Sequence, residues 1–194
     1  MEVKLLHATP LALADIAIGK CWDKQKEEVD VKRMYRVGNK YKHSSTLEHI
    51  SYTFDIDGLS RAGLQELARH RVASLSVKST RYTLKELKDT RDYRSFIVSV
   101  SPTIDRVNIA VLEKIKLELH EGTSNDRVKY MLPEAYKTSL VWTINMRSLQ
   151  NFLSLRTDKA ALWEMRDLAN KVYNAVPKDH HFMLEEFVKR YYND

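Results

Sequence analysis

Apolar and polar residues alternate most clearly in two stretches of the chain. Over residues 50–57 the apolar positions are Ile50, Tyr52, Phe54 and Ile56. Over residues 138–146, Leu140, Trp142, Ile144 and Met146 occupy alternate positions. A period of two predicts a β-strand with one buried face, so both stretches are predicted strands. Further strands are predicted at 3–9 and 93–100, and Gly58 is expected to end the strand at 50–57.

Other apolar residues recur at helical spacing. The longest predicted helix begins at Ser101-Pro102 and stops at Gly122, and its apolar positions are Ile104, Val107, Val111, Ile115 and Leu119. Further helices are expected at 10–20 with Thr9 as the N-cap, at 26–38 ending at Gly38, at 61–71 with Ser60 as the N-cap, and at 124–134, 147–156, 159–176 and 180–192. Residues 41–49 form a polar connector that could begin a helical turn. This mixture predicts an α+β (mixed α/β) fold, with residues 1–194 as a single domain whose sheet is flanked by helices.

Composition narrows the class of protein. The 194 residues are 43% hydrophobic and 30% charged, as in ordinary globular proteins. A single cysteine, Cys21, excludes an intrachain disulfide and a cysteine-based zinc site, and it favours a reducing compartment, the cytoplasm. We find no signal peptide and no apolar run of the roughly 18 residues that a membrane span needs. The net charge of +6 suggests an anionic ligand or polymer as a partner.

The most unusual segment is "RHRVASLSVKSTRY", residues 69–82, expected at the end of a helix and in the loop beyond it. Basic residues at a helix end often only complement the helix dipole. Here, however, hydroxyl residues alternate with Lys78 and Arg81, and acids are absent from Ala68 to Leu84, so no nearby carboxylate is expected to neutralise these charges. A nucleic-acid surface would need a longer basic track with aromatic residues on the same face. A compact phosphate site explains the spacing better.

Three motifs carry a resemblance to the flavin-dependent thymidylate synthase family. Arg69-His70-Arg71, followed by Ser74, Ser79 and Arg81, resembles the family signature Arg-His-Arg-x-x-Ser-x-Asn-x-x-Ser-x-Arg. The stretch "HSSTLEHISYTF" resembles the family sequence that precedes this signature, and "WTINMRSLQNFLSLR" resembles the one that follows it. Together the motifs span most of residues 43–156. The resemblance implies reductive methylation of dUMP to dTMP, with methylenetetrahydrofolate as the carbon donor, FAD as the hydride carrier and NADPH as the reductant.

The resemblance also implies roles for individual residues. FAD would be contacted by His43, Ser45, Glu48, Arg69, His70, Arg71, Val77, Asn145, Met146, Arg147 and Asn151. The nucleotide would be contacted by Glu66, Arg69, Val77, Lys78, Ser79, Thr80, Arg81, Lys129 and Arg156. Arg156 would act in catalysis at the pyrimidine, and Ser79 either as a nucleophile or in binding. The partners would be dUMP and further copies of the chain in a homotetramer with shared sites, without nucleic acid, membrane or metal.

Several alternatives remain open at this point. Ser45-x-x-Glu48 also fits a capping box, and Asn145 and Asn151 also fit helix capping or ordinary side-chain hydrogen bonding. The chain departs from the family pattern at five positions: Cys21 replaces Ser, Glu66 and Ser76 stand where Gln and Asn are usual, Val77 where Glu or Gln is common, and Lys129 where Arg is usual. A nucleic-acid-binding module, and a flavoprotein that has lost the dUMP chemistry, are the rival functions.

Overall fold

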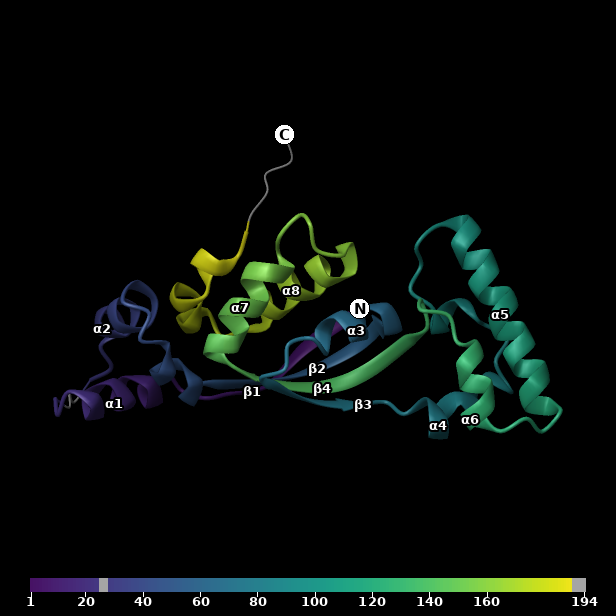
Figure 1. The fold of residues 1–194 in the computed structure, drawn as a ribbon, viewed down its shortest axis with the longest axis horizontal. Coiled ribbons are helices and arrows are strands. Elements are labelled where there is room, and N and C mark those ends of the chain that lie inside the picture. The colour runs from purple at the N-terminus through teal and green to yellow at the C-terminus, as the bar shows by residue number, and fades with distance from the viewer. Residues whose placement is uncertain (25–27, 190–194) are drawn as a thin grey trace.

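The structure, a computed structural model, describes residues 1–24 and 28–189. Within these residues the chain forms a four-stranded antiparallel sheet of order β1-β2-β4-β3 (Figure 1). The strands are β1 (Glu2–Ala8), β2 (Ser51–Ser60), β3 (Ala73–Val77) and β4 (Lys137–Asn145). The strands predicted at 3–9, 50–57 and 138–146 are thereby confirmed, as is the α+β class.

The helices lie on one face of the sheet and at its two ends (Figure 1). The face is covered by α3 (Arg61–Leu67), α7 (Met146–Arg156) and α8 (Trp163–Ala175). One end carries α1 (Ala12–Cys21) and α2 (Val31–Tyr35), and the other carries α4 (Thr80–Thr83), α5 (Pro102–His120) and α6 (Asn125–Val128). Short 3-10 helices follow the same path at Ser44–His49, Leu84–Leu87, Arg94–Phe96, Lys129–Met131, Lys178–Met183 and Glu185–Phe187.

The period-two pattern of the sequence produces a one-sided sheet. Phe54 and Trp142 are register partners on β2 and β4, and both are fully buried beneath α7 and α8. On the opposite face Thr53 and Thr143 are paired, with their hydroxyl oxygens 3.0 Å apart. A second, smaller apolar cluster lies around α5, where Leu112, Ile115 and Leu119 are buried. The larger cluster forms the floor beneath α7 and therefore fixes the helix that carries Asn151 and Arg156.

Side-chain caps set the start of three helices, two of them at serines that the sequence predicts. Ser60 accepts a hydrogen bond from Gly63 N at 2.9 Å, and Ser101 accepts one from Ile104 N at 3.3 Å. Asn145 accepts one from Ser148 N at 2.8 Å and so begins α7. The helical turn in residues 41–49 is also confirmed. The helix predicted at 124–134 is present as α6 and the 3-10 helix Lys129–Met131, and it ends before Pro133.

Two predictions about strands are wrong. Residues 73–77 are not part of a loop: they form the edge strand β3, paired with β4 from Ala73↔Ile144 to Val77↔Leu140. The alternation of Ser74 and Ser76 with apolar residues is therefore the period of a strand. Residues 93–100 do not form a strand, because Asp92 Oδ1 accepts hydrogen bonds from two following backbone N–H groups and bends the chain into a 3-10 turn. Only Ile97 makes an isolated bridge, to Tyr136.

Predictions at three element boundaries are also wrong. Thr9 does not cap a helix at Pro10; its hydroxyl accepts from Ser51 N at 3.2 Å, and α1 starts only at Ala12. Gly38 does not end a helix but lies in a buried π-helical turn, Arg36–Lys40, where a Cβ would come within 3.0 Å of the Leu47 side chain. Gly58 does not end β2, which continues through it to Ser60 with φ of 79° and a bulge.

Two helices also differ from their predictions. The N-terminal half of α5 turns Asp105 inward, because its carboxylate accepts hydrogen bonds from Ser99 and from Val100 N at 3.0 Å. Ile104 and Val107 are left exposed. The helix predicted at 180–192 is instead two short 3-10 helices, and residues 190–192 lie outside the described part, as do residues 26 and 27 of the helix predicted at 26–38.

Candidate active site

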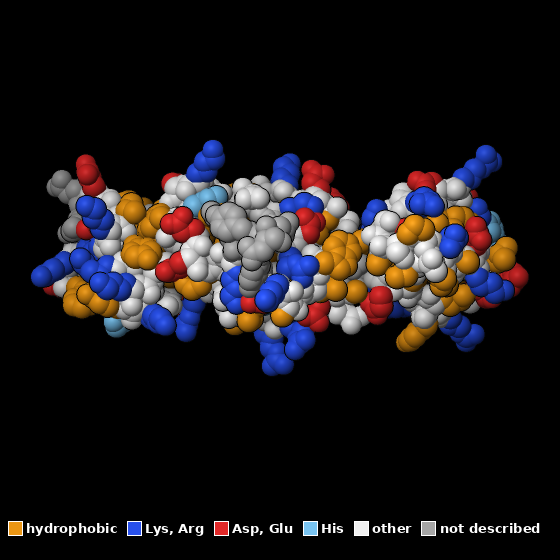
Figure 2. Space-filling view, turned by 90° about the horizontal axis from the view of Figure 1, so that it is seen from above, with side chains coloured by type: hydrophobic (Ala, Val, Ile, Leu, Met, Phe, Trp, Pro, Cys, Tyr) orange, Lys and Arg blue, Asp and Glu red, His pale blue; other side chains and the backbone are white. Residues whose placement is uncertain are grey.

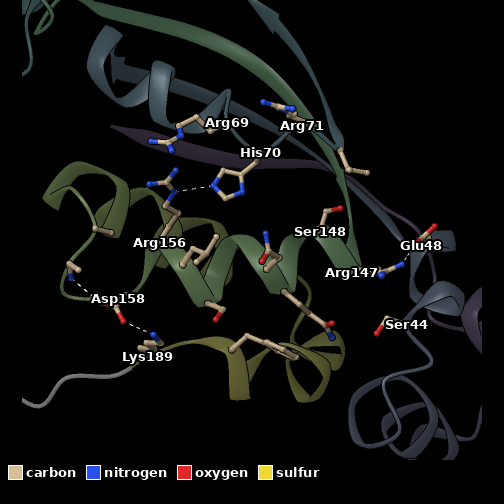
Figure 3. A pocket seen from close by; sticks show the side chains of 18 residues that line it. Ser44, Glu48, Arg69, His70, Arg71, Arg147, Ser148, Arg156, Asp158 and Lys189 are labelled. Atoms are coloured by element: carbon tan, nitrogen blue, oxygen red, sulfur yellow. Dashed lines mark hydrogen bonds and ion pairs between the residues drawn. The ribbon is translucent and has the colours of Figure 1, made fainter.

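A cleft of about 1170 Å³ lies between α7, the turn from α3 into β3, and the C-terminal segment (Figure 3). It is lined by Ser44, Glu48, Arg69, His70, Arg71, Val72, Arg147, Ser148, Gln150, Asn151, Ser154, Leu155, Arg156, Asp158, Ala160, Ala161, Phe187 and Lys189. Seven of these are predicted site residues, drawn from all three sequence motifs. The fold therefore brings together residues 48, 69–71 and 147–156, which the sequence separates by about a hundred positions.

The basic triplet occupies the turn between α3 and β3. Arg69 and Arg71 are exposed at the mouth of the cleft, whereas His70 is half-buried. The His70 ring packs edge-on against Phe152, with ring centroids 5.0 Å apart, and Phe152 packs in turn on Trp142 at 4.9 Å. His70 is therefore held by the aromatic core, while its two neighbours lie exposed at the mouth of the cleft.

Arg156, in the last turn of α7, is held by three hydrogen bonds. Its Nη1 donates to Glu66 Oε2 at 2.7 Å, its Nη2 to the Glu66 carbonyl at 3.0 Å, and its Nε to His70 Nε2 at 2.9 Å. The Arg156 side chain is only 14% exposed. These contacts fix the plane of the guanidinium, since five N–H groups in a rigid fork leave little freedom once three are bonded.

The same contacts determine the protonation states of His70 and Glu66. Burial, reinforced by the Arg156 charge, lowers the pKa of His70 to about 4, so the imidazole is neutral at pH 7. Because Nε2 accepts from Arg156, the proton of the neutral ring sits on Nδ1. The hydrogen bond from Arg156 also lowers the pKa of Glu66, which keeps that carboxylate ionised. The site therefore contains an ionised carboxylate, a fixed guanidinium and a neutral histidine donor in contact.

The other end of α7 carries Arg147, which forms an ion pair with Glu48 (Figure 3). Glu48 is thus not used in a capping box: the 3-10 turn starts at His43 without a side-chain cap. Asn145 does cap α7, as the alternative reading allowed, and Met146 is fully buried. Neither lines the cleft, nor do His43 and Ser45, which are exposed nearby in sequence.

Most of the remaining predicted residues lie beyond the far end of β3, and Val77 is the last residue of that strand. Lys78, Ser79, Thr80 and Arg81 follow this strand, and α6 leads into Lys129; none of them lines the cleft. The expectation that no carboxylate neutralises the basic segment is wrong. Lys78 pairs with Glu86 at 2.9 Å, Arg81 with Asp126 at 2.7 Å, and Arg69 with Glu66 at 3.5 Å. Glu66 and Glu86 stand just outside the acid-free stretch, whereas Asp126 lies 45 positions from Arg81 and is brought to it by the fold.

Some lining residues were not predicted from the sequence. Ser148 and Leu155 stand three positions before and four after Asn151 on α7, so the helical period alone could have placed them beside it. Phe187 and Lys189 enter the cleft from the C-terminal segment, where Lys189 pairs with Asp158 (Figure 3). No sequence signal marks that contact, because it joins unrelated elements.

Comparison with known proteins agrees with this geometry. The family model described as "Thymidylate synthase complementing protein" matches residues 4–180. The chain is 49% identical to the flavin-dependent thymidylate synthase of Wolinella succinogenes over 197 residues, which covers 94% of this chain and 97% of that protein. It is 47% identical to the Campylobacter jejuni enzyme of the same name, over 95% of this chain and 96% of that one. The chain belongs to the flavin-dependent thymidylate synthase family.

Solved structures support the same placement. The chain resembles the crystal structure of thymidylate synthase X from Helicobacter pylori with FAD and dUMP, with a TM-score of 0.93 and 44% identity. That likeness covers 98% of this chain and 100% of the other. Within the described residues, no helix has the length and apolar character needed to cross a membrane. The same part of the chain holds no cluster of three His, Cys, Asp or Glu residues suited to a metal ion.

Proposed function

We propose that the chain, acting as one domain over residues 1–194, converts dUMP to dTMP by reductive methylation. Methylenetetrahydrofolate is the carbon donor, FAD the bound cofactor and NADPH the reductant. The observation that carries the proposal is the cleft in which Arg69, His70 and Arg71 meet Arg156, in a chain of this family. The cleft is open to solvent at a mouth lined by cationic side chains, as an anionic nucleotide cofactor requires.

The residues of the cleft fit FAD. Its volume of about 1170 Å³ is somewhat above that of typical ligand pockets, about 300–1,000 Å³, and leaves room for a dinucleotide. Arg69, Arg71 and Arg147 supply exposed guanidinium groups for a pyrophosphate, and Asn151 supplies an exposed amide beside them. Ser45, His43, Asn145 and Val77 would contribute at the margins, as the resemblance implies. When bound, FAD supplies the hydride for the reductive step.

Arg156 is the residue that we assign to activation of the pyrimidine. Three of its five N–H groups are bonded to Glu66 and His70, and two remain to meet a ligand. When these two N–H groups donate hydrogen bonds to the uracil edge, they favour the negative charge that develops on N3 and O4. The electron density at C5 rises as a result. A change of one pKa unit at N3 corresponds to about 1.4 kcal/mol, or tenfold in rate. The site achieves this without a cysteine nucleophile, since Cys21 lies on α1.

Ser79 is assigned to binding rather than to nucleophilic attack. In the hydrogen-bond pattern of the described residues, its hydroxyl has no histidine or carboxylate partner that could take its proton. Together with Lys78, Thr80, Arg81 and Lys129, Ser79 instead forms a cluster of donors suited to the 5′-phosphate. Because Lys129 presents a point charge rather than a planar fork, Arg81 is the residue expected to bind the phosphate bidentately.

Two observations support a homotetramer with shared active sites. The phosphate cluster and the cleft are separated by β3, whose five residues span about 17 Å at roughly 3.3 Å per residue. A nucleotide at Arg156 therefore finds its phosphate partners more readily on another copy. In addition, apolar side chains gather on the lobe that holds α5 (Figure 2). Ile104 and Val107 of that helix are exposed. A single exposed thiol, Cys21, is compatible with the cytoplasm as the compartment.

The proposal is tested with the purified protein. It should be yellow or become so on reconstitution with FAD, dUMP should perturb the flavin spectrum, and dTMP should form when folate and NADPH are added. A colourless protein that cannot be reconstituted would overturn the proposal. A yellow protein that ignores dUMP would indicate a flavoprotein of different chemistry. Salt-sensitive binding to oligonucleotides without a chromophore would indicate a nucleic-acid-binding module.

A further inference from the structure

Glu66, at the end of α3, is a carboxylate placed between two arginines. Its Oε2 lies 2.7 Å from Arg156 Nη1, its Oε1 lies 3.5 Å from Arg69 Nη1, and its carbonyl accepts from Arg156 Nη2 at 3.0 Å. The single negative charge of Glu66 balances the charge of Arg156, and the bond to the Glu66 carbonyl holds that pair together. The Arg156–Glu66 pair therefore carries no net charge, while Arg69, at the longer distance of 3.5 Å, keeps most of its positive charge.

A guanidinium that is free of an acidic partner binds phosphate well, because its planar fork matches two phosphate oxygens. A guanidinium that is already paired with a carboxylate binds phosphate less well. Its remaining N–H groups still donate hydrogen bonds, but an approaching phosphate dianion meets the negative charge of the carboxylate at close range. Neutral acceptors, such as the carbonyl oxygens of a pyrimidine, meet no such repulsion. Whether phosphate or a pyrimidine binds thus depends on the net charge of the arginine and its carboxylate partner, and not on the arginine alone.

We propose that Glu66 is a specificity-determining residue that reserves the Arg156 end of the cleft for the neutral pyrimidine edge and rejects phosphate there. This inference rests on the proposed function. It explains how a nucleotide is held in one orientation in a cleft whose mouth is rich in arginine. The phosphate of a reversed nucleotide, or a free phosphate ion, would otherwise compete for Arg156 and Arg69.

The Arg81–Asp126 ion pair of the phosphate cluster does not have the same effect. In the Arg81–Asp126 pair the two side chains are 57% and 61% exposed, so the pair is screened and can open for a phosphate at little cost. In the Arg156–Glu66 pair they are 14% and 31% exposed, and the pair is reinforced by bonds to the Glu66 carbonyl and to His70. The two pairs therefore differ in how readily they yield to an incoming anion, and the difference favours phosphate beyond β3.

The test is calorimetric titration of the FAD-loaded protein with inorganic phosphate and with dUMP. Glu66→Gln removes the charge while keeping the shape of the side chain, and Glu66→Asp keeps the charge. We expect Glu66→Gln to bind phosphate at least about tenfold more tightly than wild type, equivalent to about 1.4 kcal/mol. Phosphate should then compete with dUMP in that variant, whereas Glu66→Asp should behave like wild type.

Two further variants locate the effect. Glu134→Gln removes one charge from a nearby exposed carboxylate that contacts Gln65 and no arginine in the described contacts, and it should leave phosphate affinity unchanged. Glu66→Gln combined with Arg156→Ala should lose the gain. The proposal is overturned if Glu66→Gln binds phosphate within about twofold of wild type, if Glu134→Gln gives an equal gain, or if the double variant retains it. Because phosphate binding is measured without turnover, these results are distinguishable from a failure of the proposed activity, which would appear as absent flavin or dUMP binding in the wild-type protein.

Discussion

Replacing Arg156 by Lys keeps the positive charge at the end of α7 and removes the planar fork. In the structure the guanidinium makes three hydrogen bonds at 2.7–3.0 Å, two to Glu66 and one to His70. A lysine ammonium can keep the contact with the Glu66 carboxylate, but it cannot reach the Glu66 carbonyl and His70 in the same plane. The charge is therefore retained while the orientation of the donors toward a bound pyrimidine is lost.

The size of the effect follows from the bonds lost. Hydrogen bonds that involve a charged group each contribute about 1.5–3 kcal/mol, and the substitution removes one or two of them from a side chain that is 14% exposed. We expect transition-state stabilisation to fall by about 2–4 kcal/mol, which lowers kcat/KM for dUMP roughly thirtyfold to thousandfold. FAD content should be unchanged, because the exposed arginines at the mouth of the cleft are untouched.

The assay is dTMP formation under saturating folate and NADPH, with dUMP affinity followed through the flavin spectrum. Arg106→Lys is the matched control, because Arg106 is exposed on α5 and contacts only Thr103 among the described side-chain contacts. It should show wild-type activity. If Arg156→Lys retained kcat/KM within about threefold of wild type, the charge alone would suffice and the argument from a fixed guanidinium plane would be wrong.

Three further predictions follow from the same geometry. Arg156→Ala should keep FAD, weaken dUMP binding sharply and abolish dTMP formation, and near-normal turnover would refute the assigned role. Ser79→Ala should keep measurable turnover if Ser79 only binds the nucleotide; complete loss with dUMP binding intact would make it the nucleophile. The depressed pKa of His70, about 4 against an ordinary value of 6.5, means that the unfolded chain binds more protons between these values. Stability should therefore be fully present above pH 6.5 and fall by up to about 3 kcal/mol toward pH 4, as urea unfolding would measure, and replacing His70 by Asn should reduce that dependence.

The elements that could be predicted are those with a clear local pattern in the sequence. The alternation of apolar and polar residues predicts β2 and β4, and a serine N-cap predicts the start of α3 and of α5. These signals depend only on neighbouring residues. β3 was missed although Ala73, Leu75 and Val77 alternate with serines, because this short run lies between basic residues and resembles a polar loop. Residues 93–100 have the composition of a strand, but the Asp92 and Asp105 carboxylates take up backbone N–H groups that a ladder would have used.

The candidate site was likewise predictable only in part. The motif residues of 69–71 and 147–156 could be predicted to act together, and the cleft brings them together. Their electrostatics could not be predicted, because the acids that pair with Arg147, Arg81 and Lys78 come from other elements. The pairing of Arg156 with Glu66 crosses 90 positions of sequence and depends on how α7 lies across the end of α3. Such contacts follow from tertiary packing, on which local patterns carry no information.

The edge strand β3 has a consequence for how activity depends on protein concentration. Its backbone is paired with β4 from Ala73 to Val77, so the span between Arg71 and Ser79 is fixed and cannot shorten by a hinge movement. If two copies of the chain must associate to complete one active site, the site becomes active through oligomerisation and not through closure of a lid. Formation of the site is then governed by mass action. The specific activity, per milligram of enzyme, should be constant at high concentration and decline on dilution, at the concentration where the copies separate.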